Sequence, residues 1–415
     1  MKIYDSYKDS GVEWIGEIPI GWTTPRLKHS ITKSFGGEVI DKSFWGDGPE
    51  TLYTTSKKIH KSDYPNFNEE RRTTESDLLL SRNGDGIVHI PPFGCIYTNV
   101  VQLVRIKDGV DRRFLWYSLT FQIKPLNSFS DGDFIVSLNK EQWFNLLTPL
   151  PPLSEQQQIV SFLDTKTLFI DSLIEKTQRK IELLKEKRTS LINEVVTKGL
   201  NPNVEMKDSG VEWIGEIPSH WEKPFFGLIS NLQQGLQIPF DDRFFEKEEG
   251  MFEYITTKSV HNPNDPRQYI LNPKKSVVCK RDEILYGRTG NTGEVITNVE
   301  GVFHNNFFKI DYDKNKIIKE YLIYQLTNSR FKETILLLSG TTTIPDLNHG
   351  DFNSMRCLIP PLQEQQQIVS HLDEQTQLID KTITIEEKRT ELLKEYRQSL
   401  ISEVVTGKLK VTTDE

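Results

Sequence analysis

The sequence has few cysteines and no long apolar run, and both absences limit what the chain can be. Its three cysteines, Cys95, Cys279 and Cys357, lie far apart and form no Cys-x-x-Cys pair. Such a set argues against a disulfide framework or a zinc site and favours a reducing compartment such as the cytoplasm. No apolar stretch approaches the ~20 residues of a membrane span, and the first ten residues hold no apolar block of the kind a signal peptide has. We therefore expect a soluble protein with three buried thiols.

Catalytic motifs are also missing. The chain contains no phosphate-binding loop of the form GxxxxGK[ST], no HExxH zinc motif and no glycine-rich nucleotide fingerprint after a strand. The Asp/Asn-Pro-Pro-aromatic tetrapeptide that suits methylation of base amino groups is absent, and IPPF at Ile90–Phe93 comes nearest to it. The sequence therefore does not predict a complete enzyme.

The net charge of −8 is spread unevenly along the chain. Residues 23–150 carry 16 basic against 15 acidic side chains, and residues 222–358 carry 17 against 18. The acidic excess lies outside these two regions. Charge alone thus neither supports nor excludes a nucleic-acid partner.

The chain is an internal duplication. The letters KDSGVEWIGEIP occur at Lys8–Pro19 and again at Lys207–Pro218, 199 positions later. A second repeat, PPLSEQQQIVSFLD and PPLQEQQQIVSHLD, begins at Pro151 and Pro360, and residues 151–200 match 360–409 at 30 of 50 positions. The spacing has grown to 209, so the middle region of the second half is ten residues longer. Two nearly identical sets of repeated segments therefore flank two divergent middle regions, the inserts. This pattern indicates either two different recognition domains on one scaffold or a duplicated domain whose loops diverged without a change of function.

The repeated frame predicts two long helices. Residues 154–198 contain no proline or glycine and keep an apolar heptad pattern, as do their equivalents after Pro361. A helix of about 45 residues would extend about 67 Å and would leave an apolar stripe in water unless it packed on its duplicate. We expect an antiparallel two-helix coiled coil with pseudo-twofold, cyclic symmetry, in which residues 6–22 lie at the end of the second helix. Arg188 and Arg397 fall on seam positions, where they either extend their charged ends into water, set the register or contact a partner protein.

Each insert is expected to be an α+β domain with a mainly antiparallel sheet. Strand candidates are Gly94–Ile106 and Gly301–Ile310, and helix candidates are Arg112–Ile123 and Lys319–Leu338. Loops rich in small polar residues lie at matching places in both inserts. Arg offers a bidentate donor pair to guanine, Asn one donor and one acceptor to adenine, and glycine allows close approach. The candidates for base contact are Arg82, Asn83, Arg288, Thr289 and Asn291, and those for phosphate or groove contact are Thr55, Lys57, Thr256 and Lys258. The alternative for each loop is an ordinary glycine-rich turn.

The paired helices, the paired GVEWIGEIP segments and the two divergent inserts resemble the specificity subunit of type I restriction–modification systems. The resemblance covers essentially the whole chain, and its main marker is the repeated Pro-Pro-Leu-x-Glu-Gln-Gln-Gln-Ile after each insert. It implies a bacterial or archaeal protein whose inserts are two target-recognition domains, each recognising half of a bipartite duplex DNA target. It also implies that the helices set the spacer and bind two modification subunits, which methylate adenine N6 with S-adenosylmethionine. ATP- and Mg-dependent restriction subunits would join the complex, while this chain would hold no cofactor and no metal.

These expectations divide the chain into six parts. Target-recognition domains are expected at 23–150 and 222–358, long helices at 151–200 and 359–410, and joint segments at 1–22 and 201–221. Two other interpretations remain open from the residues alone. One is a coiled-coil adaptor whose end domains bind proteins, and the other is a standalone DNA-cutting enzyme.

Overall fold

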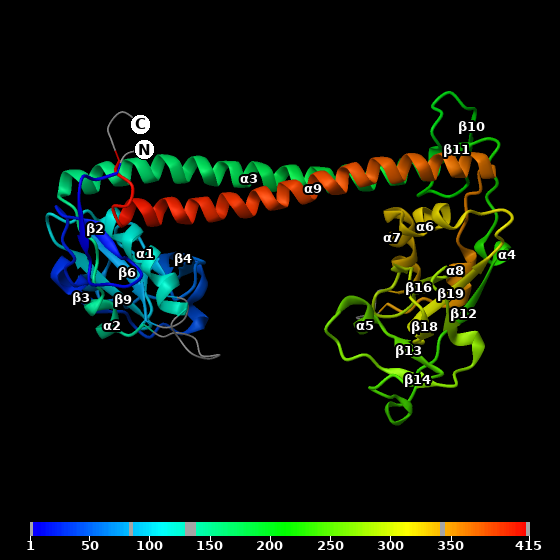
Figure 1. Ribbon diagram of the computed structural model, residues 1–415, viewed down its shortest axis with the longest axis horizontal. Coiled ribbons are helices and arrows are strands. Elements are labelled where there is room, and N and C mark those ends of the chain that lie inside the picture. The colour runs from blue at the N-terminus through cyan, green and yellow to red at the C-terminus, as the bar shows by residue number, and fades with distance from the viewer. Residues whose placement is uncertain (1–2, 83–85, 129–137, 341–344, 412–415) are drawn as a thin grey trace. The chain divides into compact units, whose positions relative to one another are not determined.

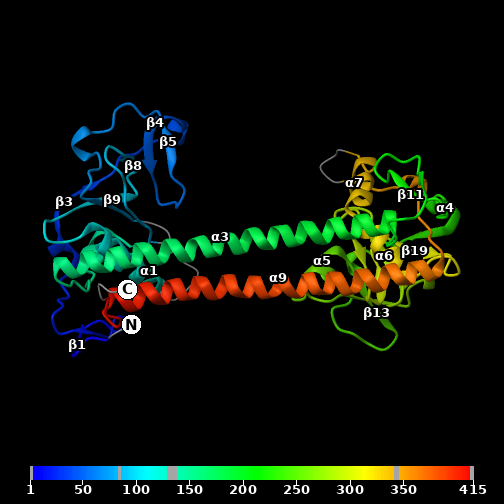
Figure 2. The ribbon, with the colours of Figure 1, turned by 90° about the horizontal axis from the view of Figure 1, so that it is seen from above.

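A computed structural model describes residues 3–82, 86–128, 138–340 and 345–411 (Figures 1 and 2). The chain forms two compact units. Unit 1 comprises residues 1–178 and 387–415, and unit 2 comprises residues 179–386. Within the described ranges, no helix is both long and apolar enough to cross a lipid bilayer.

Two long helices are divided between the units, so that each unit contains one half of each helix. They are α3 (Leu153–Lys198) and α9 (Leu362–Val405), and each begins directly after a Pro-Pro pair. A glycine with a left-handed backbone follows the C-terminal end of each helix. The φ angle is 72° at Gly199 after α3 and 73° at Gly407 after α9, as expected of residues that end a helix. In each unit the two helix halves run in opposite directions side by side (Figures 1 and 2). The predicted pair of antiparallel helices is confirmed.

The seam between the helix halves is apolar with a few polar interruptions, some of which are threonines bonded within their own helix. Ile181, Ile379 and Ile383 form a buried cluster in unit 2. Three seam threonines donate to the carbonyl four residues earlier: Thr167 to Leu163 over 2.7 Å, Thr177 to Leu173 over 2.8 Å and Thr376 to Leu372 over 2.7 Å. This bonding explains how threonine occupies a buried seam position at little cost.

The two joint segments are short hairpins packed on helix ends. In unit 1, β1 (Tyr7–Asp9) pairs with β2 (Glu17–Pro19), and in unit 2, β10 (Met206–Asp208) pairs with β11 (Glu216–Pro218). The segment after β2 contributes Trp22 to a core that includes Val404 and Val405 of α9. The equivalent Trp221 shares a core with Val195 and Val196 of α3. The repeated twelve residues therefore build the same joint twice.

The first insert contains two sheets, one antiparallel throughout and one mixed. One has the strand order β3-β9-β6-β7 and the other β5-β4-β8, in which β4 and β8 are parallel. The strands are β3 (Ile31–Gly36), β4 (Trp45–Tyr53), β5 (His60–Ser62), β6 (Asp77–Ser81), β7 (Val88–His89), β8 (Ile96–Tyr97) and β9 (Val101–Ile106). The helices are the 3-10 turns η1 (Leu27–Ser30), η2 (Lys42–Phe44) and η3 (Glu69–Arg71), followed by α1 (Arg112–Ser128) and α2 (Lys140–Asn145).

The second insert repeats this topology with the orders β12-β19-β16-β17 and β14-β13-β18-β15, in which β15 is an additional strand paired with β18. Its strands are β12 (Ser230–Gln234), β13 (Met251–Ile255), β14 (Tyr269–Leu271), β15 (Val278–Cys279), β16 (Ile284–Gly287), β17 (Val295–Ile296), β18 (Gly301–Phe303) and β19 (Phe307–Tyr312). Its helices are α4 (Phe226–Ile229), η4 (Phe240–Asp242), α5 (Thr257–His261), η5 (Lys275–Val277), α6 (Lys319–Thr327), α7 (Ser329–Leu338) and α8 (His349–Ser354). The α+β expectation is confirmed in both inserts. The helix predicted over Lys319–Leu338 is two helices, because the Asn328 side chain accepts from Arg330 N and Phe331 N and starts a new one.

Equivalent hydrogen bonds align the two inserts residue by residue. The extra ten residues of the second insert are distributed over several connections rather than inserted in one place. The offset between equivalent residues is 199 at Leu27 and Phe226, 202 at Tyr53 and Ile255, 206 at Ser81 and Gly287, 207 at Tyr117 and Tyr324, and 209 at Asn139 and Asn348.

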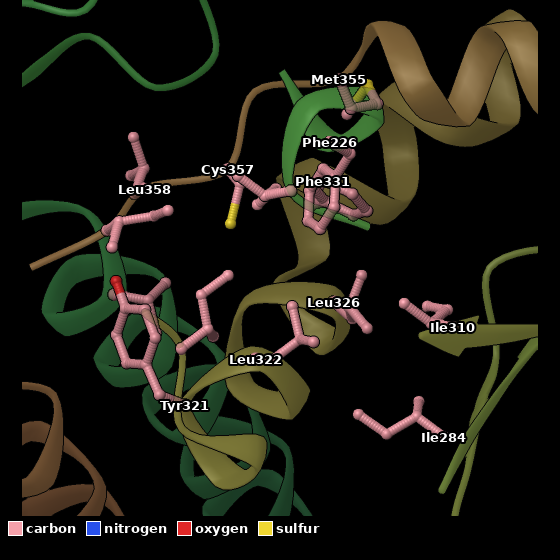
Figure 3. Close-up of a cluster of buried hydrophobic side chains, with 14 of the residues drawn as sticks. Phe226, Ile284, Ile310, Tyr321, Leu322, Leu326, Phe331, Met355, Cys357 and Leu358 are labelled. Carbon is pink, nitrogen blue, oxygen red and sulfur yellow. The ribbon is translucent and has the colours of Figure 1, made fainter. Parts of the chain in front are cut away.

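The core of unit 2 joins the insert to the long helices. Figure 3 shows Tyr321, Leu322 and Leu326 of α6 facing Cys357, with Phe331 of α7 and Phe226 of α4 nearby. All three cysteines are buried, as predicted from the sequence. Burial raises the pKa of the Cys279 thiol to about 11, so this thiol stays protonated at neutral pH.

Candidate nucleic-acid interface

In the second insert the predicted recognition loop directly follows β16. Gly287 ends the strand, and a Cβ there would lie 2.1 Å from Asn291 O, so the loop folds back too closely for any other residue. Thr292 Oγ1 lies 2.9 Å from both Arg288 O and Pro345 O and shares its one proton between these two acceptors. Thr289 Oγ1 donates to Asp346. These contacts fix the loop against the segment before α8.

Arg288 is one of the residues that hold this loop in place. Its Nε donates to Leu347 O over 3.0 Å, and its Nη2 forms an ion pair with Asp346 Oδ2 at 2.9 Å. The guanidinium also lies over the Phe308 ring at 5.8 Å from the ring centre. With a longer contact from Nη1 to Asn305 O at 3.5 Å, three of its five N–H donors are engaged within the protein, so the predicted contact with guanine would compete with these bonds. Base contact by Arg288 and Thr289 remains a prediction.

A neutral histidine holds the turn whose carbonyl accepts a hydrogen bond from the Arg288 backbone. Arg288 N donates to Asn306 O over 2.7 Å, and Asn306 N donates to His304 Nδ1 over 3.1 Å. Burial, with a smaller effect from Arg243, lowers the pKa of His304. The imidazole is thus uncharged at neutral pH and can accept this hydrogen bond.

Asn291 belongs to a different group of contacts from Arg288. Its Nδ2 donates to Glu294 Oε2 over 3.0 Å and lies 2.7 Å from His261 Nε2. His261 ends α5, thirty residues earlier in the chain, and the sequence analysis did not single it out. No sequence pattern links the two positions, because only the fold places α5 beside the loop after β16.

The corresponding loop of the first insert begins with Arg82 after β6. Its backbone N donates to Val100 O over 2.8 Å, matching the bond from Arg288 N to Asn306 O. Trp143 of α2 donates through Nε1 to Ser81 O over 2.8 Å and fixes the end of the strand. Asn83, the other predicted base contact, lies outside the described residues. The structure therefore confirms that the two loops occupy equivalent positions, while their roles in base contact remain predictions.

The four candidates for phosphate contact differ in their surroundings. Lys57 is exposed and Thr55 half-buried in the connection between β4 and β5. Thr256 is the N-cap of α5, and its hydroxyl accepts a hydrogen bond from Ser259 N. This hydroxyl therefore already stabilises the start of the helix. Lys258 is largely exposed, with Nζ 2.7 Å from Asp265 Oδ1. The offset of 202 pairs Thr256 with Thr54 rather than Thr55, since Thr54 likewise accepts from Ser56 N.

A pocket of about 310 Å³ brings the last two candidates together with aromatic side chains. Phe240 and Phe245 lie at 5.9 Å between ring centres and are both more than half exposed. Arg243 lies over the Tyr254 ring at 5.0 Å and donates to Ile238 O. Sequence analysis missed this aromatic pair because Phe240 and Phe245 follow neither a helical nor a strand period.

The two seam arginines form ion pairs between the helices. In unit 2, Arg188 Nε lies 2.9 Å from Asp380 Oδ1, and in unit 1, Arg397 Nε lies 2.8 Å from Asp171 Oδ1. These are equivalent positions of the duplication, so the pairs fix the same register twice. Each is half-exposed and contributes about 0.2–1 kcal/mol. Their predicted role in binding a partner protein remains untested.

Each unit also exposes large apolar side chains on its helix halves. These side chains lie at the position just before a seam residue and are between 48% and 63% exposed. Two pairs are related by the duplication, Phe169 with Leu378 and Leu183 with Leu392, so each unit carries one member of each pair. Unit 1 adds Tyr396 and unit 2 adds Ile385. We call these residues the apolar helix surface of each unit.

The fold and these surfaces define a class of protein: a duplicated chain in which divergent α+β inserts are joined by antiparallel helices, with equivalent loops available for recognition. The sequence model of the type I restriction modification DNA specificity domain matches residues 19–184 and 218–395, most of the chain, and the protein belongs to this family.

Curated relatives and solved structures agree with this membership. The MjaVIII specificity subunit of Methanocaldococcus jannaschii is 25% identical over 95% of this chain and 94% of its own length. The EcoDI specificity subunit of Escherichia coli is 22% identical over 95% and 90%. A chain of a solved type I R-M system superposes with a TM-score of 0.75 at 16% identity, covering 94% of this chain and 99% of its own. The HsdS subunit of Thermoanaerobacter tengcongensis gives 0.55 at 16% identity, covering 94% and 98%. At this identity the structural likeness shows the shared fold alone.

Proposed function

We propose that this chain is the DNA-recognition subunit of a type I restriction–modification complex and that each insert recognises one half of a bipartite duplex target. Residues 23–150 and 222–358 are the two target-recognition domains in this proposal. The observation that carries it is the pairing of equivalent loops after β6 and β16 with different side chains in each. One frame with two unlike loops is suited to two unlike half-sites.

The helix pair is proposed to set the spacer between the half-sites. An insertion of seven residues between Gln178 and Arg179, matched by seven between Glu386 and Glu387, keeps the heptad register in both helices. It adds about 10 Å of helix at ~1.5 Å per residue, which equals about three base pairs of B-DNA. We expect the same two half-sites with a spacer about three base pairs longer.

The measurement is selection from random duplex DNA by the complex of the chain with its modification subunits, followed by sequencing. A four-residue insertion in one helix only is the control, because it breaks the seam register. An unchanged spacer would contradict the proposal that the helix pair sets the distance between the half-sites. A wild-type complex without any bipartite preference would overturn the proposed function and support the coiled-coil adaptor instead.

The apolar helix surface of each unit is proposed to bind one modification subunit. Two equivalent surfaces suit two copies of one partner, since the duplication places the same kind of apolar contact in each unit. In this proposal the chain has no catalytic activity or cofactor of its own, and it acts in the bacterial or archaeal cytoplasm. S-adenosylmethionine, ATP and Mg are used by the modification and restriction subunits.

Substitutions on this surface should change how many partner subunits bind. We expect Leu378→Glu and Phe169→Glu each to weaken one of the two binding sites by about 10–100-fold, because an interfacial contact worth more than ~1 kcal/mol is lost and a charge is buried. Native mass spectrometry should then show one modification subunit per chain instead of two, and none in the double variant. Glu175→Ala, on an exposed position of α3, is the matched control and should keep two. Two bound subunits in the double variant would exclude this surface.

A further inference from the structure

A basic loop with one exposed apolar side chain connects β4 to β5 in the first insert. We call residues 54–61, with the sequence TTSKKIHK, the basic loop, and it contains no carboxylate. Lys57, Lys58 and Lys61 are exposed, and so is Ile59, at 52%. Among the described residues, none of the three ammonium groups forms an ion pair, and Lys61 Nζ has a 3.5 Å contact with a hydroxyl group. The loop therefore presents three positive charges around one aliphatic group.

The basic loop is held in place by its own hydrogen bonds and by an aromatic contact. Ser56 N donates to Thr54 Oγ1 over 3.1 Å, and Lys58 N donates to Ser56 Oγ over 3.0 Å. At the other end of the loop, the ring of His60 lies 5.0 Å from that of Trp45. Because the backbone is fixed on both sides of the exposed aliphatic residue, binding requires little further ordering of the loop.

The basic loop lies beside the predicted recognition loop of the first insert. One turn contacts both: Thr98 N donates to Tyr53 O, directly before the basic loop, over 3.1 Å, and Val100 O accepts from Arg82 N over 2.8 Å. The rings of Tyr53 and His89 lie 5.1 Å apart and link β4 to β7, the strand after the recognition loop. The two loops therefore flank the same turn.

The second insert shows the same proximity through a direct side-chain contact. With the offset of 202 found at Tyr53 and Ile255, Ile59 corresponds to His261. His261 Nε2 lies 2.7 Å from Nδ2 of Asn291, in the loop after β16. The equivalent position thus contacts the recognition loop in the second insert, and the first insert places an aliphatic side chain there.

The corresponding connection of the second insert carries its charges differently. Residues 256–268 contain two basic side chains besides histidine, and both are paired with carboxylates. Lys258 Nζ lies 2.7 Å from Asp265 Oδ1, and Arg267 Nη1 lies 3.0 Å from Glu253 Oε1. We therefore expect the first insert to supply more of the salt-dependent DNA affinity.

We propose that the basic loop contacts DNA, with Ile59 against a thymine methyl group and Lys57, Lys58 and Lys61 on flanking phosphates. This inference rests on the proposed function and names one base contact and three phosphate contacts within it. The 5-methyl group of thymine is the apolar group that unmodified bases present in the major groove, so an aliphatic side chain there favours thymine. Lysines that hold no ion pair within the described part of the chain neutralise phosphates without first losing a carboxylate partner.

The first test replaces thymidine by deoxyuridine, which lacks the 5-methyl group. The complex of the chain and its modification subunits first selects its target from random duplex DNA, and deoxyuridine is then placed at each selected thymine in turn. We expect one position, in one half-site, at which this change weakens binding of the wild type by about 3–5-fold, the effect of burying one methyl group. Ile59→Ala should bind both duplexes equally, and Ile59→Val should keep most of the difference. Phe93→Ala, which removes an apolar side chain 75% exposed before β8, is the matched control and should respond as the wild type does.

The second test measures how binding depends on salt concentration. Each lost phosphate contact should reduce the slope of log affinity against log salt concentration by about 0.9. We expect this reduction in each of Lys57→Gln, Lys58→Gln and Lys61→Gln, and a reduction of about 2.7 in the triple variant. Lys107→Gln, which replaces an exposed lysine after β9, is the matched control and should keep the wild-type slope.

The two tests can each contradict the assignment. The Ile59 contact is wrong if no selected thymine is sensitive to loss of its methyl group in the wild type, or if Ile59→Ala keeps the difference. The phosphate contacts are wrong if the triple lysine variant keeps the wild-type salt slope. These results leave the bipartite preference of the wild type in place, whereas failure of the proposed function would remove that preference itself.

Discussion

Replacing Trp22 by alanine is expected to lower the free energy of unfolding of unit 1 by about 3–5 kcal/mol, the usual cost of deleting a buried indole. Trp22 is 1% exposed, and its Nε1 donates to Glu155 Oε2 over 3.1 Å. Its ring lies 6.4 Å from that of Phe114. The substitution therefore removes packing between the joint, the insert and α3 together, and it leaves Glu155 without one of its donors.

The duplication provides a matched variant in the other unit. Trp221 is equally buried and donates to Glu364 Oε1 over 3.1 Å. In unit 2, residues 199–205 connect α3 directly to β10, whereas in unit 1 the helix that packs on the joint, α9, is far from it in sequence. Both alanine variants should lose similar stability, but only Trp22→Ala should release its hairpin from α9.

Urea unfolding and amide hydrogen exchange measure these two effects. We expect faster exchange over residues 7–19 in Trp22→Ala and a smaller change over residues 206–218 in Trp221→Ala. Trp22→Phe, which keeps most of the ring, should lose about half as much stability or less. Equal exchange of both hairpins in the two variants would show that the covalent connection is not what holds the second joint.

Much of the frame could be predicted because the sequence repeats it. The heptad pattern and the Pro-Pro and glycine boundaries define α3 and α9 by local chemistry, and the 199- and 209-residue offsets implied that both joints lie on helix ends. The break at Asn328 was missed, because a helix-capping side chain inside an apolar run looks like an ordinary polar helix residue.

The recognition surfaces could be predicted only in part. Matching short motifs placed Arg82 and Arg288 at equivalent strand ends. The motifs did not reveal that Arg288 would be engaged by Asp346, which is 58 residues away, or that Asn291 would meet His261. Those contacts depend on which loops the two sheets bring together, and each is a pairing of side chains with no local spacing rule.

The buried ion pair in the first insert should produce an effect as large as the tryptophan substitutions. Asp77 on β6 is fully buried and lies opposite Arg105 on β9. Arg105 donates from Nε to Oδ1 over 2.9 Å and from Nη2 to Oδ2 over 3.0 Å, and Thr74 N donates to Oδ2 over 2.6 Å. The carboxylate is thus held by three donors.

Arg105→Met is expected to cost about 3–5 kcal/mol of unfolding free energy, because it leaves a buried carboxylate without its counter-charge. The double variant Asp77→Asn with Arg105→Met should recover most of this loss, since asparagine keeps the acceptor for Thr74 N and removes the buried charge. Denaturant unfolding of the single and double variants measures the difference. If the double variant is no more stable than Arg105→Met alone, the cost comes from lost packing of the arginine side chain and not from the uncompensated charge.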